Sequence, residues 1–394
     1  MRVALVCLRG AINMASWRGS ADSIVTSLEA LGHTVCRIDF GDEYRPAFYK
    51  PKQLFHQYVL RQTYSRHREP AMLRYYGAEL SRRIEAFDVD VVLSLTAMPV
   101  PYLKVRAPIV IWNDAPFDAL IDFYPGFSRL SSASKRDGHE MERVAHALAA
   151  RAVYSSAWGA NVAAAYGHPE RIRVVPFGAN VSVRDDDAAL LAAAAARPRE
   201  TLNLTWIGME WERKGGDVAL DVVAQLQRAG RSARLRIAGE KPPRATRLPH
   251  GVEVLGFVRG AAKEALLAES HFLILPSRAE CWGLVFAEAA AFATPSLASR
   301  VGGIPAIVRD GITGQTFDVD DAAGYATFLE RIAEDGARYE ALCRGALALY
   351  RSELNWTSAA SAIADVLYEV ADKRAHHANG SAQPFQSLAG RQLR

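Results

Sequence analysis

Two glutamates and a glycine near the two-thirds point of the chain could hold a ligand that carries both phosphate and hydroxyl groups. Glu280 and Glu288 are separated by seven residues, and Gly283 lies between them, where the apolar run 272–276 gives way to an alanine-rich segment. The run predicts a strand and the segment a helix. Because the first N–H groups of a helix lack intrahelical acceptors, this turn predicts an anion site. Carboxylates on either side of it suit a nucleotide sugar.

A second segment, residues 207–216 (IGMEWERKGG), places two adjacent cations before a glycine pair. We expect a strand end, a loop that carries Arg213 and Lys214, and then a helix. An arginine can hold a diphosphate with a forked pair of N–H donors, and a lysine supplies a compact positive charge. The alternative is a solvated basic turn. The position at the end of a strand favours the binding interpretation.

The apolar runs are unbroken rather than alternating, which is typical of strands buried on both faces of a parallel sheet. A loop at residues 17–20 should separate the first strand from a helix that ends at Gly32. The predicted strands of the first half are 2–8, 34–38, 89–95, 109–112, 152–154 and 172–175. Those of the second half are 202–207, 234–238, 252–255, 272–275 and 296–299, with helices at 217–227, 262–268 and 284–292.

Two such series in 394 residues predict two domains of the α/β class, each a doubly wound, Rossmann-like parallel sheet. Residues 1–183 and 201–351 are the predicted domains, and the acidic and alanine-rich stretch 184–200 is the predicted linker. The tail 373–394 has no periodic apolar pattern, so we expect disorder there. Ligands of this architecture bind at the carboxyl ends of the strands, in the cleft.

Composition excludes several classes of function. A net charge of +4 is too small to indicate nucleic-acid binding. The four cysteines lie far apart without a C-x-x-C pair, which favours reduced thiols in a cytoplasmic protein. The N-terminal apolar run is too short to span a membrane, and it lacks the small-residue cleavage site of a signal peptide.

The second half of the chain resembles the donor-binding domain of retaining GT-B glycosyltransferases, family 4 in particular. Four segments carry the resemblance, in family order and spacing: 207–217, 254–258, 275–299 and 302–314. The first half is similar to one bacterial branch of the family at 17–20, 112–127 and 153–180. Residues 355–368 resemble the closing helix that crosses back to the first domain, so 352–372 is the predicted crossover helix.

The resemblance implies a role for each residue around the predicted anion site. Glu288 would accept hydrogen bonds from the ribose hydroxyls of the donor, and Glu280 would contact the transferred sugar. The backbone N–H groups of Gly283, Leu284 and Val285 would hold phosphate oxygens.

The resemblance also implies that Arg213 and Lys214 neutralise the diphosphate. Many family members have an arginine directly after the glycine that matches Gly208, where this chain has Met209. Lys214 keeps the family spacing from Gly208, so we expect Arg213 to take over the role of the missing arginine.

Four further residues complete the predicted site. The backbone of Val258 would meet the base, and Gly19 would let the first-domain loop approach the phosphates. Trp17 and Asp114 are candidate contacts to the acceptor or the sugar on the side of the first domain. Local capping near residues 115–116 is an equally good explanation of Asp114.

No metal or other cofactor is expected. Cleavage of the sugar–phosphate bond develops negative charge on the departing diphosphate, and fixed cations and helix-end N–H groups can stabilise that charge. The acidic run at 185–187 falls in the predicted linker, where a solvated turn explains it. By resemblance, the acceptor attacks on the face from which the diphosphate leaves, and Glu280 positions the sugar without forming a covalent bond.

Residues 44–83 mix basic and aromatic side chains and indicate a partner. Such a mixture can dock on an anionic membrane at the inner face, or hold an acidic or glycan acceptor. The alternative is a helical insertion whose aromatic residues are core and whose cations are solvated.

These features together predict an enzyme, a retaining, metal-independent glycosyltransferase of the hexosyltransferase type. Its donor would be a UDP- or GDP-linked sugar and its acceptor a glycan or lipid-linked saccharide, in cell-surface polysaccharide or glycoconjugate biosynthesis. A catalytically silent nucleotide-sugar-binding subunit is the alternative. A dinucleotide oxidoreductase is a weaker alternative, because the first strand is not followed by G-x-G-x-x-G.

Overall fold

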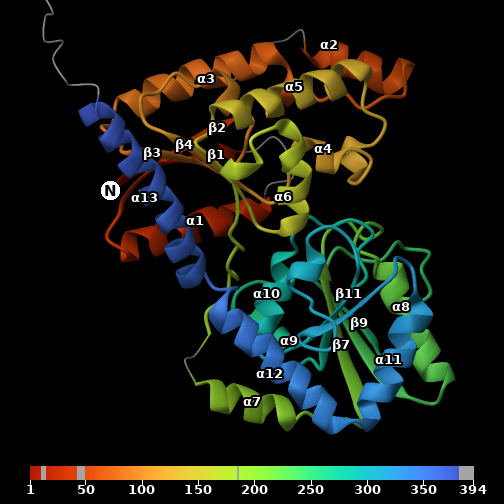
Figure 1. The fold of residues 1–394 in the computed structure, drawn as a ribbon. Helices are drawn as coiled ribbons and strands as arrows, with labels where there is room; N and C mark the ends of the chain where they lie inside the picture. The colour runs from red at the N-terminus through yellow and green to blue at the C-terminus, as the bar shows by residue number, and fades with distance from the viewer. Residues whose placement is uncertain (10–14, 42–48, 184–185, 381–394) are drawn as a thin grey trace, which may run out of the picture.

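The computed structural model describes residues 1–9, 15–41, 49–183 and 186–380 (Figure 1). Within these residues the chain forms two six-stranded sheets, one above the other in Figure 1, and helices cover both. Every strand pair is parallel. The predicted α/β class with two Rossmann-like sheets is confirmed.

The first sheet has the strand order β2-β1-β3-β4-β5-β6. Its interior strand β1 buries Val3, Ala4, Leu5 and Val6 completely, as expected for a strand covered on both faces. The strands are β1 (Arg2–Arg9), β2 (Thr34–Gly41), β3 (Val91–Ser94), β4 (Ile109–Asn113), β5 (Arg151–Tyr154) and β6 (Ile172–Val174). The longer helices around them are α1 (Ala15–Ala30), α3 (Pro70–Glu85) and α5 (Ser132–Leu148).

The loop expected at residues 17–20 is wrong, because α1 already begins at Ala15. Ser20, Ala21, Ile24 and Leu28 all fall on the buried face of α1, so this face extends back into the predicted loop through a polar residue, Ser20, that the apolar pattern does not include.

The second sheet has the order β12-β11-β10-β7-β8-β9. The strands are β7 (Thr201–Gly208), β8 (Ser232–Gly239), β9 (Val252–Gly256), β10 (Phe272–Leu275), β11 (Ser296–Ser299) and β12 (Gly314–Phe317). The helices are α8 (Gly216–Arg228), α9 (Ala261–Ala268), α10 (Leu284–Ala290), α11 (Ala322–Glu334) and α12 (Gly336–Ser352). The sequence did not indicate β12, because this short edge strand lacks an unbroken apolar run.

Helix α13 (Trp356–Gly380) runs from the second domain along the first and packs against α1 (blue in Figure 1). Arg151 of β5 donates from Nε to Glu369 of α13 at 3.2 Å, which fixes the helix to the first sheet. The tail expected from residue 373 therefore begins inside a helix that extends to Gly380. Residues 381–394 lie outside the described residues.

The two crossings between the domains lie side by side. The N–H of Ala179, on the first crossing, donates to the carbonyl of Leu354 on the second at 2.9 Å. Trp356 Nε1 donates to Asn180 Oδ1 at 2.8 Å, and Asn180 Nδ2 donates to Ser20 of α1 at 3.2 Å. Asn180 thus connects both crossings to the first domain.

The linker expected at 184–200 contains a helix, α7 (Asp187–Ala195), which packs against α12. Asp186 accepts the N–H of Ala189 at 2.9 Å and caps this helix. The acidic residues 186–187 therefore begin a helix and do not form the solvated turn expected there. Asp185 lies outside the described residues.

Arg197, which follows α7, is buried with 8% of its surface exposed, and it donates only to neutral acceptors. These acceptors are Ala268 O, Phe292 O, Ala293 O, Thr294 Oγ1 and Tyr339 Oη. The carbonyls end α9 and follow α10, so Arg197 satisfies groups that helix geometry leaves without partners.

We expect Arg197→Met to lower the free energy of unfolding by about 2–4 kcal/mol, because several buried carbonyls lose their donor. Urea denaturation followed by circular dichroism measures the change. Arg106→Met is the matched control, since that side chain is 88% exposed. Equal unfolding midpoints for the two variants would show that the linker is not part of the folded core.

Candidate functional site

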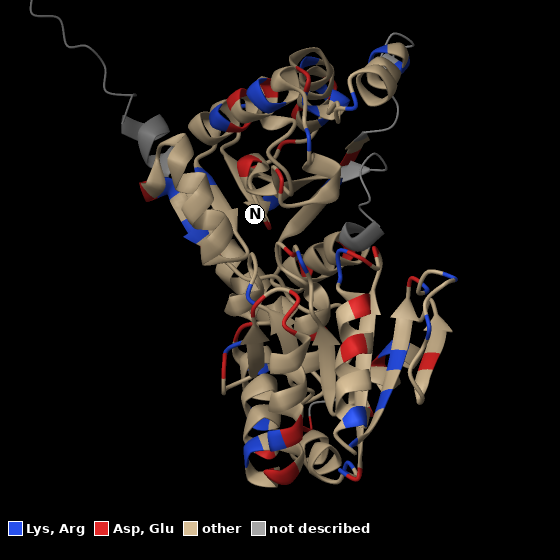
Figure 2. Ribbon diagram, turned by 90° about the vertical axis from the view of Figure 1, so that its right-hand side faces the viewer, with Lys and Arg blue, Asp and Glu red and all other residues tan. Residues whose placement is uncertain are grey.

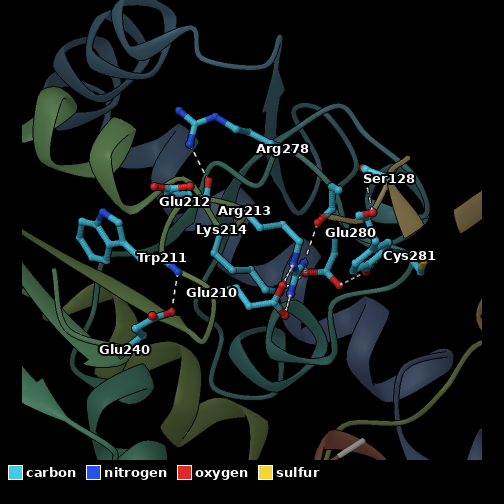
Figure 3. Close-up of polar contacts among 12 residues, drawn as sticks. Ser128, Glu210, Trp211, Glu212, Arg213, Lys214, Glu240, Arg278, Glu280 and Cys281 are labelled. Carbon is cyan, nitrogen blue, oxygen red and sulfur yellow. Dashed lines mark hydrogen bonds and ion pairs between the residues drawn. The ribbon is translucent and has the colours of Figure 1, made fainter. Parts of the chain in front are cut away.

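Two loops of the second domain meet at the carboxyl ends of β7 and β10, which are neighbours in the sheet. The first loop joins β7 to α8 and carries Arg213 and Lys214, and the second joins β10 to α10 and carries Glu280 (Figure 3). Parallel α/β sheets bind ligands at this edge because loops from adjacent strands converge there. The structure thus brings together the residues that the sequence indicated.

Lys214 and Glu280 form the central contact of the site. Lys214 Nζ makes an ion pair with Glu280 Oε2, and Arg213 Nη1 lies 3.6 Å from the same oxygen. The side chains of Arg213, Lys214 and Glu280 are 9%, 12% and 9% exposed. One buried carboxylate therefore faces two buried cations.

Arg213 also fastens the two loops together. It donates from Nε and Nη2 to the carboxylate of Glu210, at 2.9 Å each, and from Nη1 to the carbonyl of Ala279 at 2.7 Å. Met209 is 53% exposed. It occupies the position at which many members of the family that the sequence resembles have an arginine. The sequence did not indicate Glu210, although its spacing of three residues from Arg213 fits a pair within one turn.

Glu288 lies within α10 and is buried, and its Oε1 accepts from Lys263 Nζ of α9 at 2.7 Å. Burial raises the pKa of the Glu288 carboxyl, and the charge of Lys263 opposes the rise. Lys263 was not indicated by the sequence. Its place at the start of a predicted helix after segment 254–258 was the available signal, but the pairing depends on how α9 packs against α10.

Gly283 permits the turn before α10. Its φ of +82° lies in the left-handed region, and a Cβ there would sit 2.7 Å from the Phe286 ring and 3.2 Å from Glu280 Cγ. Leu284 and Val285 are the first residues of α10 and are partly buried. Their role in holding phosphate oxygens stays a prediction.

The remaining predicted contacts differ in position. Gly208 ends β7, and a Cβ there would lie 3.2 Å from Lys214 Cγ, so it closely underlies the site. Val258 follows β9 and is partly buried. Gly19 lies in α1, beside Asn180, and not in the loop expected for it. Trp17 also lies in α1, and its side chain is outside the described residues.

Two side chains of the first domain face this site. Asp114 follows β4, and burial together with the negative charge of Glu280 raises its pKa to about 6. Tyr124 contacts Glu280 and Cys281 directly. Nothing in the sequence singled out Tyr124 within segment 112–127.

A pocket of about 330 Å³ lies beside these contacts. Pro125 of the first domain forms one wall, and the second domain forms the rest. The lining residues from the second domain are Glu210, Trp211, Glu212, Arg213, Glu240, Lys241 and Pro243. The pocket therefore lies between the domains, next to the cations.

The wider charge distribution is mixed. Figure 2 shows basic and acidic residues intermixed on the helices of both domains. Among the described residues, no cluster of three or more His, Cys, Asp or Glu side chains is arranged to hold a metal ion.

Comparison with known proteins finds relatives in sequence and in fold. Residues 201–335 match the family model described as "Glycosyl transferases group 1". The D-inositol 3-phosphate glycosyltransferase of Acidothermus cellulolyticus is 30% identical over 229 residues, which cover 53% of this chain and 50% of that protein. The chain thus spans about half the length of the curated relatives it matches.

Solved structures match over nearly the whole chain. The Anabaena protein HepE in complex with UDP and glucose has a TM-score of 0.62 at 16% identity, over 92% of this chain and 98% of that one. Sucrose-phosphate synthase from Thermosynechococcus elongatus has a TM-score of 0.67 at 15% identity, over 96% and 99%.

The two facing sheets define a GT-B protein. Within its second domain, residues 201–335 resemble group 1 glycosyl transferases. The predicted glycosyltransferase resemblance is confirmed at this level, and the finer assignment to family 4 stays a prediction.

The raised pKa of Asp114 has a measurable effect on stability. The Asp114 carboxyl has a pKa of about 6 in the folded protein and its ordinary value of 3.8 in the unfolded chain. Between pH 3.8 and pH 6 it therefore takes up a proton when the protein folds. Its ionisation therefore destabilises the fold as the pH rises through this window. We expect Asp114→Asn to become more stable relative to the wild type from pH 4 to pH 7, by on the order of 2 kcal/mol.

Urea denaturation at a series of pH values measures this difference. Asp221→Asn, at a side chain of α8 that is 54% exposed, is the matched control and should show no such slope. A flat difference for Asp114→Asn would place its carboxyl in solvent, away from Glu280.

Proposed function

We propose that the protein is a retaining, metal-independent glycosyltransferase that transfers a sugar from a UDP- or GDP-linked donor to a saccharide. The observation that carries this proposal is the buried cluster of Arg213, Lys214 and Glu280 at the carboxyl edge of the second sheet, within the domain that matches group 1 glycosyl transferases. The cluster combines groups for a diphosphate with a group for sugar hydroxyls.

Lys214 and the start of α10 would stabilise the leaving diphosphate. Breaking the sugar–phosphate bond develops negative charge on the phosphate oxygens, and one fixed donor in a dry site is worth about 3 kcal/mol in the transition state. The backbone N–H groups of Leu284 and Val285 would act in the same way, because they lack intrahelical acceptors. Arg213, held by Glu210, would add positive charge near the diphosphate while keeping the loop in place.

The two buried glutamates would bind the hydroxyl groups of the donor. Glu288 would accept from the ribose hydroxyls and Glu280 from the transferred sugar, with Val258 near the base. When the diphosphate binds Lys214 in place of Glu280, the carboxylate oxygen of Glu280 that contacted Lys214 becomes free to accept a hydrogen bond from a sugar hydroxyl. Glu280 would orient the sugar, and the departing phosphate would assist deprotonation of the acceptor on the same face.

The acceptor would enter from the side of the first domain. Asp114 is the candidate there for an acceptor or sugar hydroxyl, because it lies close enough to Glu280 for the charge of that residue to raise its pKa. Two structural neighbours are titled as glycosyltransferases of lipopolysaccharide synthesis, WaaB and WaaG. They support a glycan or lipid-linked saccharide acceptor, in cell-surface polysaccharide or glycoconjugate biosynthesis.

HepE supports the choice of donor. Structures of that protein contain UDP with glucose, or UDP-glucose. UDP-glucose is therefore the first donor to test.

A catalytically silent nucleotide-sugar-binding subunit is the second candidate. Two observations favour it: Met209 replaces the arginine common in relatives by resemblance, and Arg213 is committed to Glu210 and Ala279. Donor turnover separates the two functions.

We expect isothermal titration to show binding of UDP or GDP, and mass spectrometry with a panel of nucleotide sugars to show donor hydrolysis or transfer. Lys214→Ala should lower turnover by about 100-fold to 1,000-fold, because the leaving diphosphate loses a buried cation. Lys104→Ala, at an exposed position of the first domain, is the control and should behave like the wild type.

The outcomes separate the candidates. Binding of UDP or GDP without any turnover would favour the silent subunit. Absence of binding to both nucleotides would reject both proposals.

Residues 49–83 of the segment divide into two parts in the structure, and residues 44–48 lie outside the described residues. In the part from residue 60 onward Tyr64 and Tyr76 are buried in the core, as the alternative interpretation held, while Tyr75 is 38% exposed. Helix α2 (Tyr49–Leu54) and the turn η1 (Phe55–Val59) instead expose apolar side chains, and Tyr58 and Val59 are 71% and 64% exposed. None of the helices among the described residues is long and apolar enough to cross a membrane.

We propose that α2 and η1 dock the protein on the cytoplasmic, inner face of an anionic membrane, where a lipid-linked acceptor would lie. Lys50 and Arg61 flank the exposed apolar side chains, whereas Lys52 is paired with Glu69. Apolar insertion and attraction of these cations to lipid phosphates would act together.

Pelleting with phosphatidylglycerol vesicles should bring down the wild type at low salt and less of it at high salt, because the Debye length shortens from about 10 Å at 0.1 M. The double variant Tyr58→Ser, Val59→Ser should lose most of this binding. Phe87→Ser, which changes an exposed apolar residue elsewhere on the first domain, is the control. Equal pelleting of all three proteins would show that α2 and η1 do not form the contact.

A further inference from the structure

Tyr124 is held in a rigid turn of the first domain. It follows α4 (Phe117–Leu120), and its N–H donates to the carbonyl of Leu120 at 3.1 Å. Its own carbonyl accepts the N–H of Phe127 at 2.8 Å and the hydroxyl of Ser128 at 3.3 Å. The backbone is therefore fixed on both sides of Tyr124, so the direction of the side chain follows the position of the first domain.

The side chain of Tyr124 crosses to the second domain and makes three contacts there. Its hydroxyl accepts the backbone N–H of Cys281 at 3.1 Å and donates a long hydrogen bond to Glu280 Oε1 at 3.5 Å. The guanidinium of Arg213 lies over its ring, 4.8 Å from the centroid.

These contacts complete the surroundings of the Glu280 carboxylate. Oε2 of Glu280 faces Lys214 and Arg213, which belong to its own domain. Oε1 faces Tyr124, which belongs to the other domain. Each oxygen of the proposed sugar-binding carboxylate is thus held from a different domain.

The contact lies in a packed interface. Cys281 packs with Ala115 and Ala119 of the first domain, and Phe123 packs against Trp158 with ring centroids 5.2 Å apart. Burial first, and then the charge of Glu280, raise the pKa of Tyr124, so its hydroxyl stays protonated and able to donate.

On the second domain, the loop that follows β11 contains a glycine that permits this close approach of the two domains. Gly302 has a φ of +54°, and a Cβ there would lie 1.9 Å from the Glu280 carbonyl and 3.2 Å from the Phe123 ring. Only a glycine lets the loop pass between the two. The close approach of the domains at Glu280 is therefore built into both sides.

We propose that Tyr124 is the positioning residue that completes the donor site from the opposite domain, aligning Glu280 and Arg213 only when the two domains meet. This inference rests on the proposed glycosyltransferase function and deepens it. The Glu280 carboxylate loses its second anchor when the domains separate. A donor that binds the second domain alone is then held by the cations, while its sugar is aligned only after the first domain has approached.

The main test is Tyr124→Phe, which removes the hydroxyl and keeps the ring over Arg213. We expect kcat for transfer from UDP-glucose, or from the donor found in the screen, to fall by about 10-fold to 100-fold, the range of a lost hydrogen bond to a charged group. The Kd for UDP from isothermal titration should not change, and the midpoint of thermal unfolding should fall only slightly, because one interdomain hydrogen bond is lost. Tyr368→Phe, at a tyrosine of α13 that is 46% exposed, is the matched control.

A double-mutant cycle shows whether Tyr124 acts through Glu280. In single-turnover measurements, Tyr124→Phe should lower the rate of transfer little further in the Glu280→Gln background, because the hydroxyl then has no carboxylate to orient. If instead the fold-losses in rate of the two single variants multiply in the double variant, this role is overturned. A merely structural tyrosine would lower the unfolding midpoint and weaken UDP binding together with kcat.

Amide hydrogen exchange tests the contact itself, whatever the activity. The peptide that contains Cys281 should exchange faster in Tyr124→Phe, because its N–H loses the acceptor, and peptides of β1 should be unchanged. Unchanged exchange at Cys281 would overturn the contact. A wild type that turns over donor, with Tyr124→Phe at the wild-type rate, would overturn the role of Tyr124 alone. A wild type without turnover of any nucleotide sugar would overturn the proposed function, and the role in transfer with it.

Discussion

The rest of the site depends on the buried ion pair between Lys214 and Glu280. In a site of low dielectric, a lone cation or a lone carboxylate is strongly destabilising, whereas a matched pair is tolerated. Arg213 and Glu210 form a second matched pair beside it. The cluster therefore contains two cations and two carboxylates, and its charges balance without a ligand.

This balance limits which ligands can enter. A simple anion would compete with Glu280 for Lys214 and leave the buried carboxylate with the more distant Arg213, 3.6 Å away, in place of its closest cation. A ligand that carries a diphosphate and sugar hydroxyls would supply a replacement for each partner, since its phosphate would face the lysine and its hydroxyls the glutamate. Under the proposed function, the pair would therefore favour molecules in which both groups lie a short distance apart.

The part of the site that follows from strand order could be predicted from the sequence. Lys214 and Glu280 lie at the ends of β7 and β10, and the carboxyl ends of adjacent parallel strands meet at one edge. Lys263 and Tyr124 could not be predicted, because their partners depend on how a helix packs and how the domains dock. Local pattern was also insufficient at residues 17–20, where a helix begins without an uninterrupted apolar stripe.

The two halves of the chain are under different physical constraints. The fold matches solved structures over more than nine-tenths of the chain, whereas the family model matches only residues 201–335. A buried parallel sheet requires only apolar runs of suitable length, which many sequences satisfy. A site that balances buried charges requires particular residues at particular positions, and these lie in the second domain. The first domain touches that site at Tyr124. Domain approach therefore links the first domain, which would select the acceptor, to the second domain, which would activate the donor.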